Sequence, residues 1–177
     1  FDNRAAMRRL TGTVLSLGHR RIATISARTA GNDRARLRVA GIRDALAAAG
    51  LDAAVLPVVE TVYEIDAGAA AFAELMALNP RPTAVLCGND VLAAGALRQA
   101  REMGLEVPRD VSVTGFDDIE LARIVTPALT TVHVPHREMG TRAARQLVEM
   151  VERKAAGRTV ALEAQLCLRD SLGPPPD

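Results

Sequence analysis

Residues 82–118 form the sequence PTAVLCGNDVLAAGALRQAREMGLEVPRDVSVTGFDD, which contains a strand–helix–strand pattern. The apolar runs Ala84–Cys87 and Val111–Val113 are typical of buried strands, and the segment Val91–Met103 between them has helical periodicity. Gly104 supplies the left-handed residue with which many helices end. Because a helix joins the two strands, the pattern predicts a right-handed crossover between parallel strands.

Both predicted strands end in a glycine that is followed by amide or carboxylate side chains. Gly88 precedes Asn89 and Asp90, and Gly115 precedes Phe116, Asp117 and Asp118. Ligands of open parallel sheets bind just beyond the carboxyl ends of the strands. Asn89 and Asp117 are therefore expected to line a binding site at this edge.

Strands and helices alternate along the rest of the chain as well. Predicted strands cover residues 21–26, 53–59, 129–134 and 160–168. Predicted helices cover residues 3–17, 34–49, 67–78 (with Asp66 as the cap) and 137–155, and a short helical turn covers residues 119–125. This alternation predicts an α/β fold, namely a doubly wound parallel sheet.

The composition is that of a globular domain without a nucleic-acid surface of its own. The 177 residues, 49% of them hydrophobic, suffice for one core or for one lobe and part of another. A net charge of +1 supplies no basic field, although a DNA-binding module could lie outside this chain. Phe1 resembles the end of a strand, so we expect a fragment of a longer protein, and the sequence contains neither a transmembrane run nor an export leader.

The sequence contains no enzyme signature, and we expect neither catalysis nor a cofactor. It has no Walker loop, no nucleophile elbow, no dinucleotide-binding fingerprint and no Cys/His cluster with metal-ligand spacing. Cys87 and Cys167 lie in apolar runs and are interpreted as reduced, buried thiols, with a disulfide or a nucleophile as the alternative. His19, just after a predicted helix end, is interpreted as a partner of the helix dipole.

Three arginines in the opening turns of the helix predicted at residues 34–49 are candidates for binding. Arg34, Arg36 and Arg38 oppose the helix dipole there, so they form either a solvated face or donors that reach into a cleft. Arg36 is the one that we expect to be merely exposed.

Two further loops offer acceptors. Asp90 is interpreted as an ordinary N-cap, and Asn89 either forms a turn or contacts a ligand. Of Asp117 and Asp118, one is expected to cap the following turn and the other to accept hydrogen bonds from paired hydroxyls.

Several motifs, in order and at compatible spacings, carry a family resemblance. They are LGHRRIA at residues 17–23, RVAGI at 38–42, PTAVLCGND at 82–90, VPRDVSV at 107–113, GFDD at 115–118, TPALTTV at 126–132 and LRDS at 168–171. Together they resemble the effector-binding core of the lactose-repressor/purine-repressor (LacI/GalR) family of bacterial transcription regulators.

The resemblance implies a core of two lobes, similar to type I periplasmic binding proteins, with the effector between them. Residues 1–134 would be most of the C-terminal lobe, residues 135–158 a helix returning to the N-terminal lobe, and residues 159–177 the final strand and tail. The effector, most simply a sugar, would contact Arg38, Asn89 and Asp117, with Arg34 and Asp33 as further candidates.

The same resemblance implies a cytoplasmic homodimer that contacts no membrane. Operator DNA would bind through a helix-turn-helix headpiece that precedes Phe1, and residues 90–103 and 119–125 would contribute to the dimer interface. Val134 departs from the polar residue that relatives often place there, which leaves the identity of the effector open. Glu163 replaces a usual proline without evident consequence.

A periplasmic sugar-binding protein that serves a transporter is the alternative, because it would share the fold and the cleft. The sequence upstream of Phe1 distinguishes the two classes of protein. A transporter-linked binding protein would have a signal peptide there, and a transcription regulator would have a helix-turn-helix.

Overall fold

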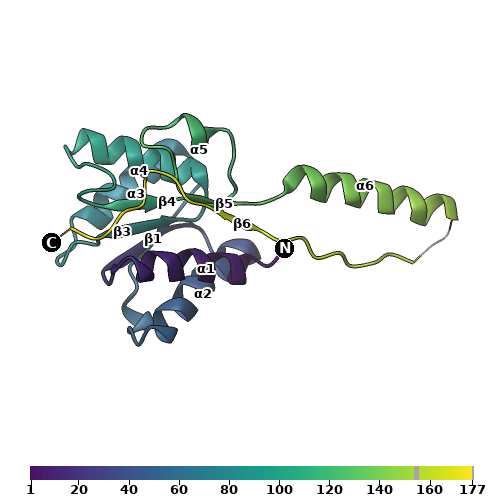
Figure 1. The fold of residues 1–177 in the computed structure, drawn as a ribbon, viewed down its shortest axis with the longest axis horizontal. Helices are drawn as coiled ribbons and strands as arrows, with labels where there is room; N and C mark the ends of the chain where they lie inside the picture. Colours follow the sequence, from purple (N-terminus) through teal and green to yellow (C-terminus); the bar gives the residue numbers. More distant parts are fainter. Residues whose placement is uncertain (154–155, 177) are drawn as a thin grey trace.

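The computed structural model describes residues 1–153 and 156–176 and confirms the α/β fold (Figure 1). Four parallel strands form the main sheet in the order β2-β1-β3-β4, namely β1 (Ile22–Ala27), β2 (Val58–Thr61), β3 (Ala84–Cys87) and β4 (Ser112–Thr114). Helices α1 (Asn3–Ser16) and α2 (Asp33–Ala48) cover one face, whereas α3 (Ile65–Met76) and α4 (Asp90–Glu102) cover the other. The sheet is therefore doubly wound, as predicted.

Successive side chains of a strand point to opposite sides of the sheet, and β3 consists of consecutive apolar residues. Both faces of the sheet are therefore apolar along this strand. In β3, Val85 and Cys87 pack into the cluster formed with α3 and α4, whereas Ala84 and Leu86 pack into the cluster formed with α1 and α2. These four side chains are fully buried. Two cores thus fix the sheet edge from which the candidate binding residues project.

Glycines bring the helices of each pair into close contact. A Cβ atom at Gly41 of α2 would overlap the carbonyl oxygen of Arg4 in α1, and one at Gly95 of α4 would overlap that of Ile65 in α3. The helix pairs therefore pack backbone against backbone at these two positions.

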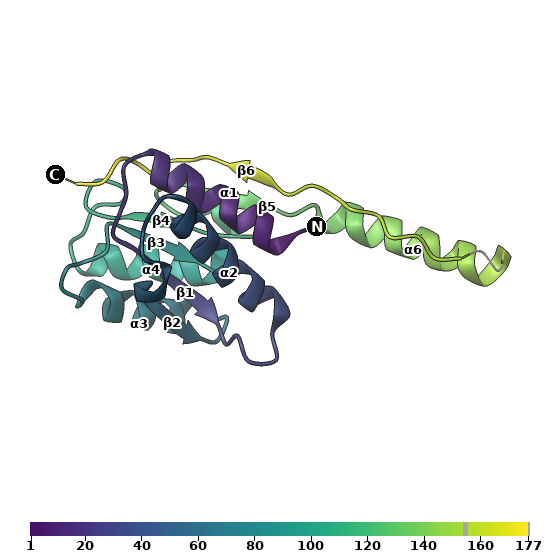
Figure 2. The ribbon, with the colours of Figure 1, turned by 90° about the horizontal axis from the view of Figure 1, so that it is seen from below.

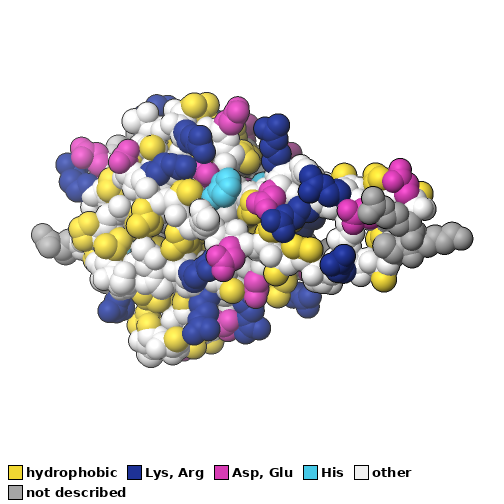
Figure 3. Space-filling view, turned by 45° about the vertical axis from the view of Figure 1, so that its right-hand side comes forward, with side chains coloured by type: hydrophobic (Ala, Val, Ile, Leu, Met, Phe, Trp, Pro, Cys, Tyr) yellow, Lys and Arg dark blue, Asp and Glu magenta, His cyan; other side chains and the backbone are white. Residues whose placement is uncertain are grey.

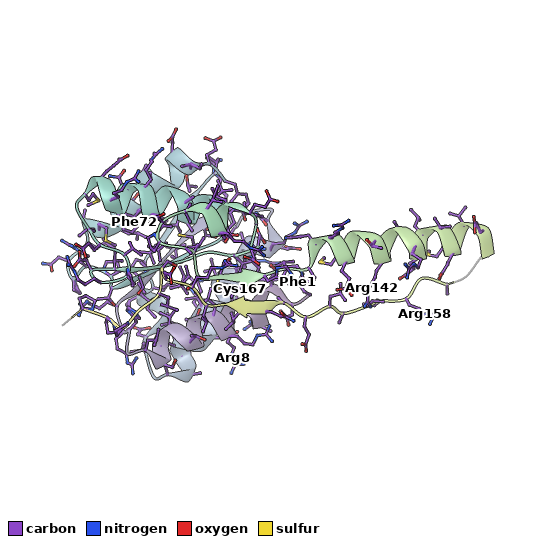
Figure 4. All side chains as sticks on the ribbon, turned by 45° about the horizontal axis from the view of Figure 1, so that its top comes forward. Phe1, Arg8, Phe72, Arg142, Arg158 and Cys167 are labelled. Atoms are coloured by element: carbon purple, nitrogen blue, oxygen red, sulfur yellow. The ribbon has the colours of Figure 1, made fainter. Side chains whose placement is uncertain are left out.

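A long arm projects from this body. Strands β5 (Thr131–His133) and β6 (Gln165–Cys167) pair antiparallel, and between them α6 (His136–Arg153) extends away from the sheet (Figures 1 and 2). Residues 156–164 run back beside α6, where the Gln146 amide donates to the Arg158 carbonyl at 2.8 Å. Figure 4 shows Arg142 and Arg158 along this arm and Phe1 at its base. None of the described helices is both long and apolar enough to cross a membrane.

Several element boundaries differ from the sequence-based expectations. The strand expected at residues 53–59 is replaced by the 3-10 turn η1 (Ala53–Val55), and strand pairing begins only at Val58, after Pro57, which has no N–H to donate. Asp66 does not cap α3. It lies in the first turn of that helix and pairs with Arg98 at 2.8 Å.

The predicted last strand shortens to β6, because the residues before it run beside the arm and not beside β5. The predicted helix 137–155 is α6, whose last two predicted residues lie outside the described part of the chain.

Two side chains also have environments that differ from those expected. Leu37, expected to face the core, is 36% exposed, and the neighbouring Arg38 is buried instead. His19 is not a partner of the helix dipole. Its ring is fully buried and hydrogen-bonds with Thr83 Oγ1 at 2.9 Å and the Gly173 carbonyl at 2.8 Å. Burial lowers the pKa of His19, so the ring is a neutral link between β1, β3 and the tail.

Candidate functional site

A buried guanidinium organises the site at the carboxyl edge of the sheet. The side chain of Arg38 is only 6% exposed. Its Nε donates to Asn3 Oδ1 at 2.8 Å, its Nη1 donates to the Gly88 carbonyl at 2.6 Å, and its Nη2 donates to Asp117 Oδ1 at 3.2 Å. The guanidinium carbon lies 3.8 Å from the centroid of the Phe116 ring. Groups from α1 and from the segments after β3 and β4 therefore hold this one cation, which α2 supplies.

The attraction within this ion pair offsets only part of the cost of its burial, because the pKa of Arg38 stays lowered and the pKa of Asp117 stays raised. Burial lowers the pKa of Arg38, and the nearby Asp117 carboxylate raises it. Burial likewise raises the pKa of Asp117, while Arg38, His136 and Arg34 lower it. The two charges stabilise each other in a place where either one alone would be costly.

The two adjacent carboxylates have separate environments. Asp117 faces Arg38, whereas the Asp118 side chain, 2% exposed, accepts hydrogen bonds from Arg169 Nη2 at 2.5 Å and from His133 Nδ1 at 3.0 Å. Burial raises the pKa of Asp118, but these bonds hold it below its usual value. The expectation that one of them caps the next turn was wrong, because α5 (Leu121–Ile124) begins without a side-chain cap.

The cap of α4 is one residue earlier than expected. Asn89 Oδ1 accepts from the Leu92 amide at 2.9 Å, so Asn89, and not Asp90, is the N-cap of α4. Asp90 is fully buried and accepts from the Ile119 amide at 2.8 Å and from Thr131 Oγ1 at 2.6 Å. Burial raises the pKa of Asp90 to about 6. Asp90 thus fastens the segment after β4.

The remaining predicted residues lie at the rim. Arg34 is exposed and precedes Arg38 by four residues in α2, so the two share a helix face. Asp33 instead pairs with Arg36 at 2.6 Å, and both of those side chains are well exposed. The structure therefore brings Arg38 and Asp117 into contact, with Arg34 and Asn89 beside them, and leaves Asp33 paired outside.

Sequence analysis missed four residues around Arg38. Asn3 was predicted only as a helix cap and Phe116 only as part of a motif, and the orientation of their side chains required the folded chain. Tyr63 follows β2, is 41% exposed and lies in the surroundings of Arg38. As the only tyrosine of the sequence and one that follows a strand, it carried a usable signal. His136, the first residue of α6, lies 3.8 Å from Asp117.

A groove adjoins the site between the segment after β4 and the start of α6. Its lining is rich in charged and titratable side chains, which include Asp117, His133, His136, Arg137, Arg142 and Arg145. Figure 3 shows dark blue and magenta side chains close together in the region where the arm leaves the body. The groove thus offers polar partners next to Asp117.

Comparison with known proteins places this geometry in a family. Residues 11–172 match the periplasmic binding protein-like domain. The chain belongs to that family. It is 37% identical to the HTH-type transcriptional repressor PurR of Erwinia tasmaniensis over 92% of this chain and 48% of the relative. It is 34% identical to the ribose operon repressor of Haemophilus influenzae over 92% of this chain and 49% of the relative.

A solved structure agrees with these relatives. A LacI family transcriptional regulator from Enterococcus faecium with bound ribose superposes with a TM-score of 0.91 at 27% identity, covering 98% of this chain and 64% of that one. The resemblance to LacI/GalR regulators is thereby confirmed. The chain spans about half the length of the curated relatives named here.

Proposed function

We propose that this chain is the effector-binding lobe of a LacI-type transcription regulator. The observation that carries the proposal is the buried Arg38–Asp117 pair at the carboxyl edge of a doubly wound sheet. This edge is where open α/β sheets bind their ligands. The repressors among the relatives support a regulator over a transporter-linked binding protein and over an enzyme.

The effector is a small polar molecule, most simply a sugar or a sugar derivative. Asp117 accepts hydrogen bonds from ligand hydroxyls, and Arg38 and the Asn89 amide donate to ligand oxygens. The exposed ring of Tyr63 offers an apolar surface to the ring of the ligand. Arg34 and, farther out, Asp33 complete the rim. The ribose bound to the Enterococcus faecium regulator supports this chemical class.

A second lobe covers the site and the arm in the complete protein. Leu147, Val148 and Val151 of α6 are 62%, 52% and 74% exposed, an apolar surface that a soluble protein buries. We therefore assign residues 1–134 to the C-terminal lobe, residues 135–158 to the crossing into the N-terminal lobe, and residues 159–177 to the returning strand and tail. The greater length of the relatives supports this division.

The effector controls DNA binding because its affinity differs between two arrangements of the lobes. An effector that binds one arrangement more tightly shifts the population toward it, and this shift changes the spacing of two headpieces in a homodimer. In the dimer, α4 and α5 supply part of the interface, where Ile124 is 76% exposed. The regulator acts in the cytoplasm, where its operator DNA lies.

The test uses the full-length native protein. DNA fragments of the source genome are selected by binding, and the anisotropy of a selected fragment is followed while D-ribose, cellobiose and other sugars are added. The proposal predicts specific DNA binding that one of these compounds changes in the wild type but not in Asp117→Ala. A protein that selects no DNA, or an Asp117→Ala variant that responds like the wild type, would contradict it.

A further inference from the structure

The candidate site has an excess of positive charge. Arg38 and Asp117 neutralise each other at 3.2 Å, and Asp33 is already engaged by Arg36 at 2.6 Å. Arg34 lies one turn before Arg38 on the same face of α2, and it acts electrostatically on both Arg38 and Asp117. Among the described residues, Arg34 has neither an ion-pair nor a hydrogen-bond partner. One cation at the rim therefore remains unbalanced.

The position of Arg34 at the start of α2 is only weakly unfavourable for a cation, because the residue is exposed and water screens the repulsion. A cation in the first turn of a helix is repelled by the positive end of the helix dipole and, here, by Arg38. The protein nevertheless places Arg34 there, while Arg36 of the same turn receives a carboxylate partner. An anion brought in by the ligand would relieve both repulsions.

Arg38 offers a second, independent indication. A guanidinium has five N–H groups, and three of them are used by Asn3, Gly88 and Asp117. Two N–H groups remain on a side chain that is only 6% exposed. Each guanidinium nitrogen already has one partner, and the two remaining N–H groups are free to donate to a ligand at the sheet edge.

We propose that the effector of this protein carries an anionic group, a carboxylate or a phosphate, which Arg34 and Arg38 bind together. This inference rests on the proposed function and specifies its ligand. The anionic group lies over the first turns of α2, while the polar remainder of the ligand extends toward Asp117 and Tyr63. Val134, an apolar side chain just before α6, offers no hydrogen bond to a neutral hydroxyl at the end of the site next to α6.

The first experiment uses inorganic phosphate as the probe and the full-length native protein at fixed low ionic strength. Isothermal titration compares the wild type with Arg34→Gln and with Arg43→Gln. Arg43 is a matched control because it is an exposed arginine of the same helix, nine residues further on and therefore on the opposite face. We expect saturable binding that Arg34→Gln weakens about tenfold or more and that Arg43→Gln changes less than about twofold. Absence of saturable binding, or equal loss in both variants, would overturn the proposal.

The second experiment separates this proposal from the proposed function. Thermal shifts are measured with two matched pairs of compounds, D-ribose with D-ribose 5-phosphate and D-glucose with D-gluconate. The anionic member of a pair should stabilise the wild type more, and Arg34→Gln should remove that preference. The contrary result is a neutral sugar that stabilises the wild type and Arg34→Gln equally but no longer stabilises Asp117→Ala. In that case the proposed function stands and the anionic effector is refuted.

Discussion

Asp117 and Asp118 are adjacent in the chain, yet their carboxylates bind different parts of the protein. Asp117 lies 3.2 Å from Arg38 Nη2 in the candidate site, whereas Asp118 lies 2.5 Å from Arg169 Nη2 beside β5 and β6. Both residues have positive φ angles, 107° and 55°, which side chains other than glycine seldom adopt. This backbone lets one short segment join the site to the two strands that lead into the arm.

Removing either member of the buried ion pair should abolish the response to the effector. In Asp117→Ala and Arg38→Ala the ligand loses a charge-assisted hydrogen bond, so effector affinity should fall by at least about tenfold. Leaving one charge of the buried pair alone lowers stability, but operator binding without effector should remain at temperatures where the variants stay folded, because neither residue belongs to a DNA-binding surface. Titration of the effector against both variants checks this, and an affinity equal to that of the wild type would refute the site.

Asp118 should matter for stability more than for ligand binding. In Asp118→Ala, Arg169 would lose its carboxylate partner at a site that is only 19% exposed. We expect a loss of about 2–3 kcal/mol in the free energy of unfolding. Urea denaturation measures it, with the exposed Glu120→Ala as a control that should change stability by less than about 0.5 kcal/mol. Equal stabilities of the two variants would show that this contact is not structural.

Asp90 should make stability depend on pH. Burial raises its pKa to about 6 in the folded protein, above the usual value of 3.8, so the folded state binds more protons than the unfolded state between these values. Stability should therefore fall, by up to about 3 kcal/mol, as the pH rises from about 4 to above 6. Asp90→Asn cannot titrate, so the wild type should lose stability relative to this variant across that range. A stability difference that is constant with pH would contradict the raised pKa.

Gly95 should tolerate no side chain. A Cβ atom there would overlap the Ile65 carbonyl of α3, so Gly95→Ala should destabilise the protein by about 1–3 kcal/mol. Gly12 of α1 has nothing within 4 Å of the corresponding position. Gly12→Ala should raise stability by up to about 1 kcal/mol, because alanine favours a helix. Unfolding curves that move in the same direction for both variants would contradict the close packing of α3 and α4.

The fold could be predicted because its signals are local. The apolar runs around Ala84–Cys87 and the periodic segment from Val91 to Met103 specify a crossover by themselves, and their repetition along the chain specifies the sheet. The error at residues 53–59 arose where an apolar run contains Pro57 and follows the capping side chain of Asp52. There, a local hydrogen bond outweighs the preference of the run for a strand.

The site could be predicted only in part, because the contacts of its side chains are made with residues that are distant in sequence. The topology placed Asn89 and Asp117 at one edge, and the family resemblance added Arg38, but adjacent residues such as Asn89 and Asp90 are both good caps. The role of Asp90 depends on Thr131 and the Ile119 amide, which are distant in sequence. Asn3 is likewise 35 residues from the guanidinium that it holds.

The most direct test of the central claim is the intact mass and N-terminal sequence of the native protein from its source cell. We predict a chain about twice as long as this one, in keeping with its relatives, that opens with a helix-turn-helix pattern. That result would establish a DNA-binding regulator. A cleaved leader without a headpiece would instead establish a transporter-linked binding protein, and a native chain that begins at Phe1 would contradict both.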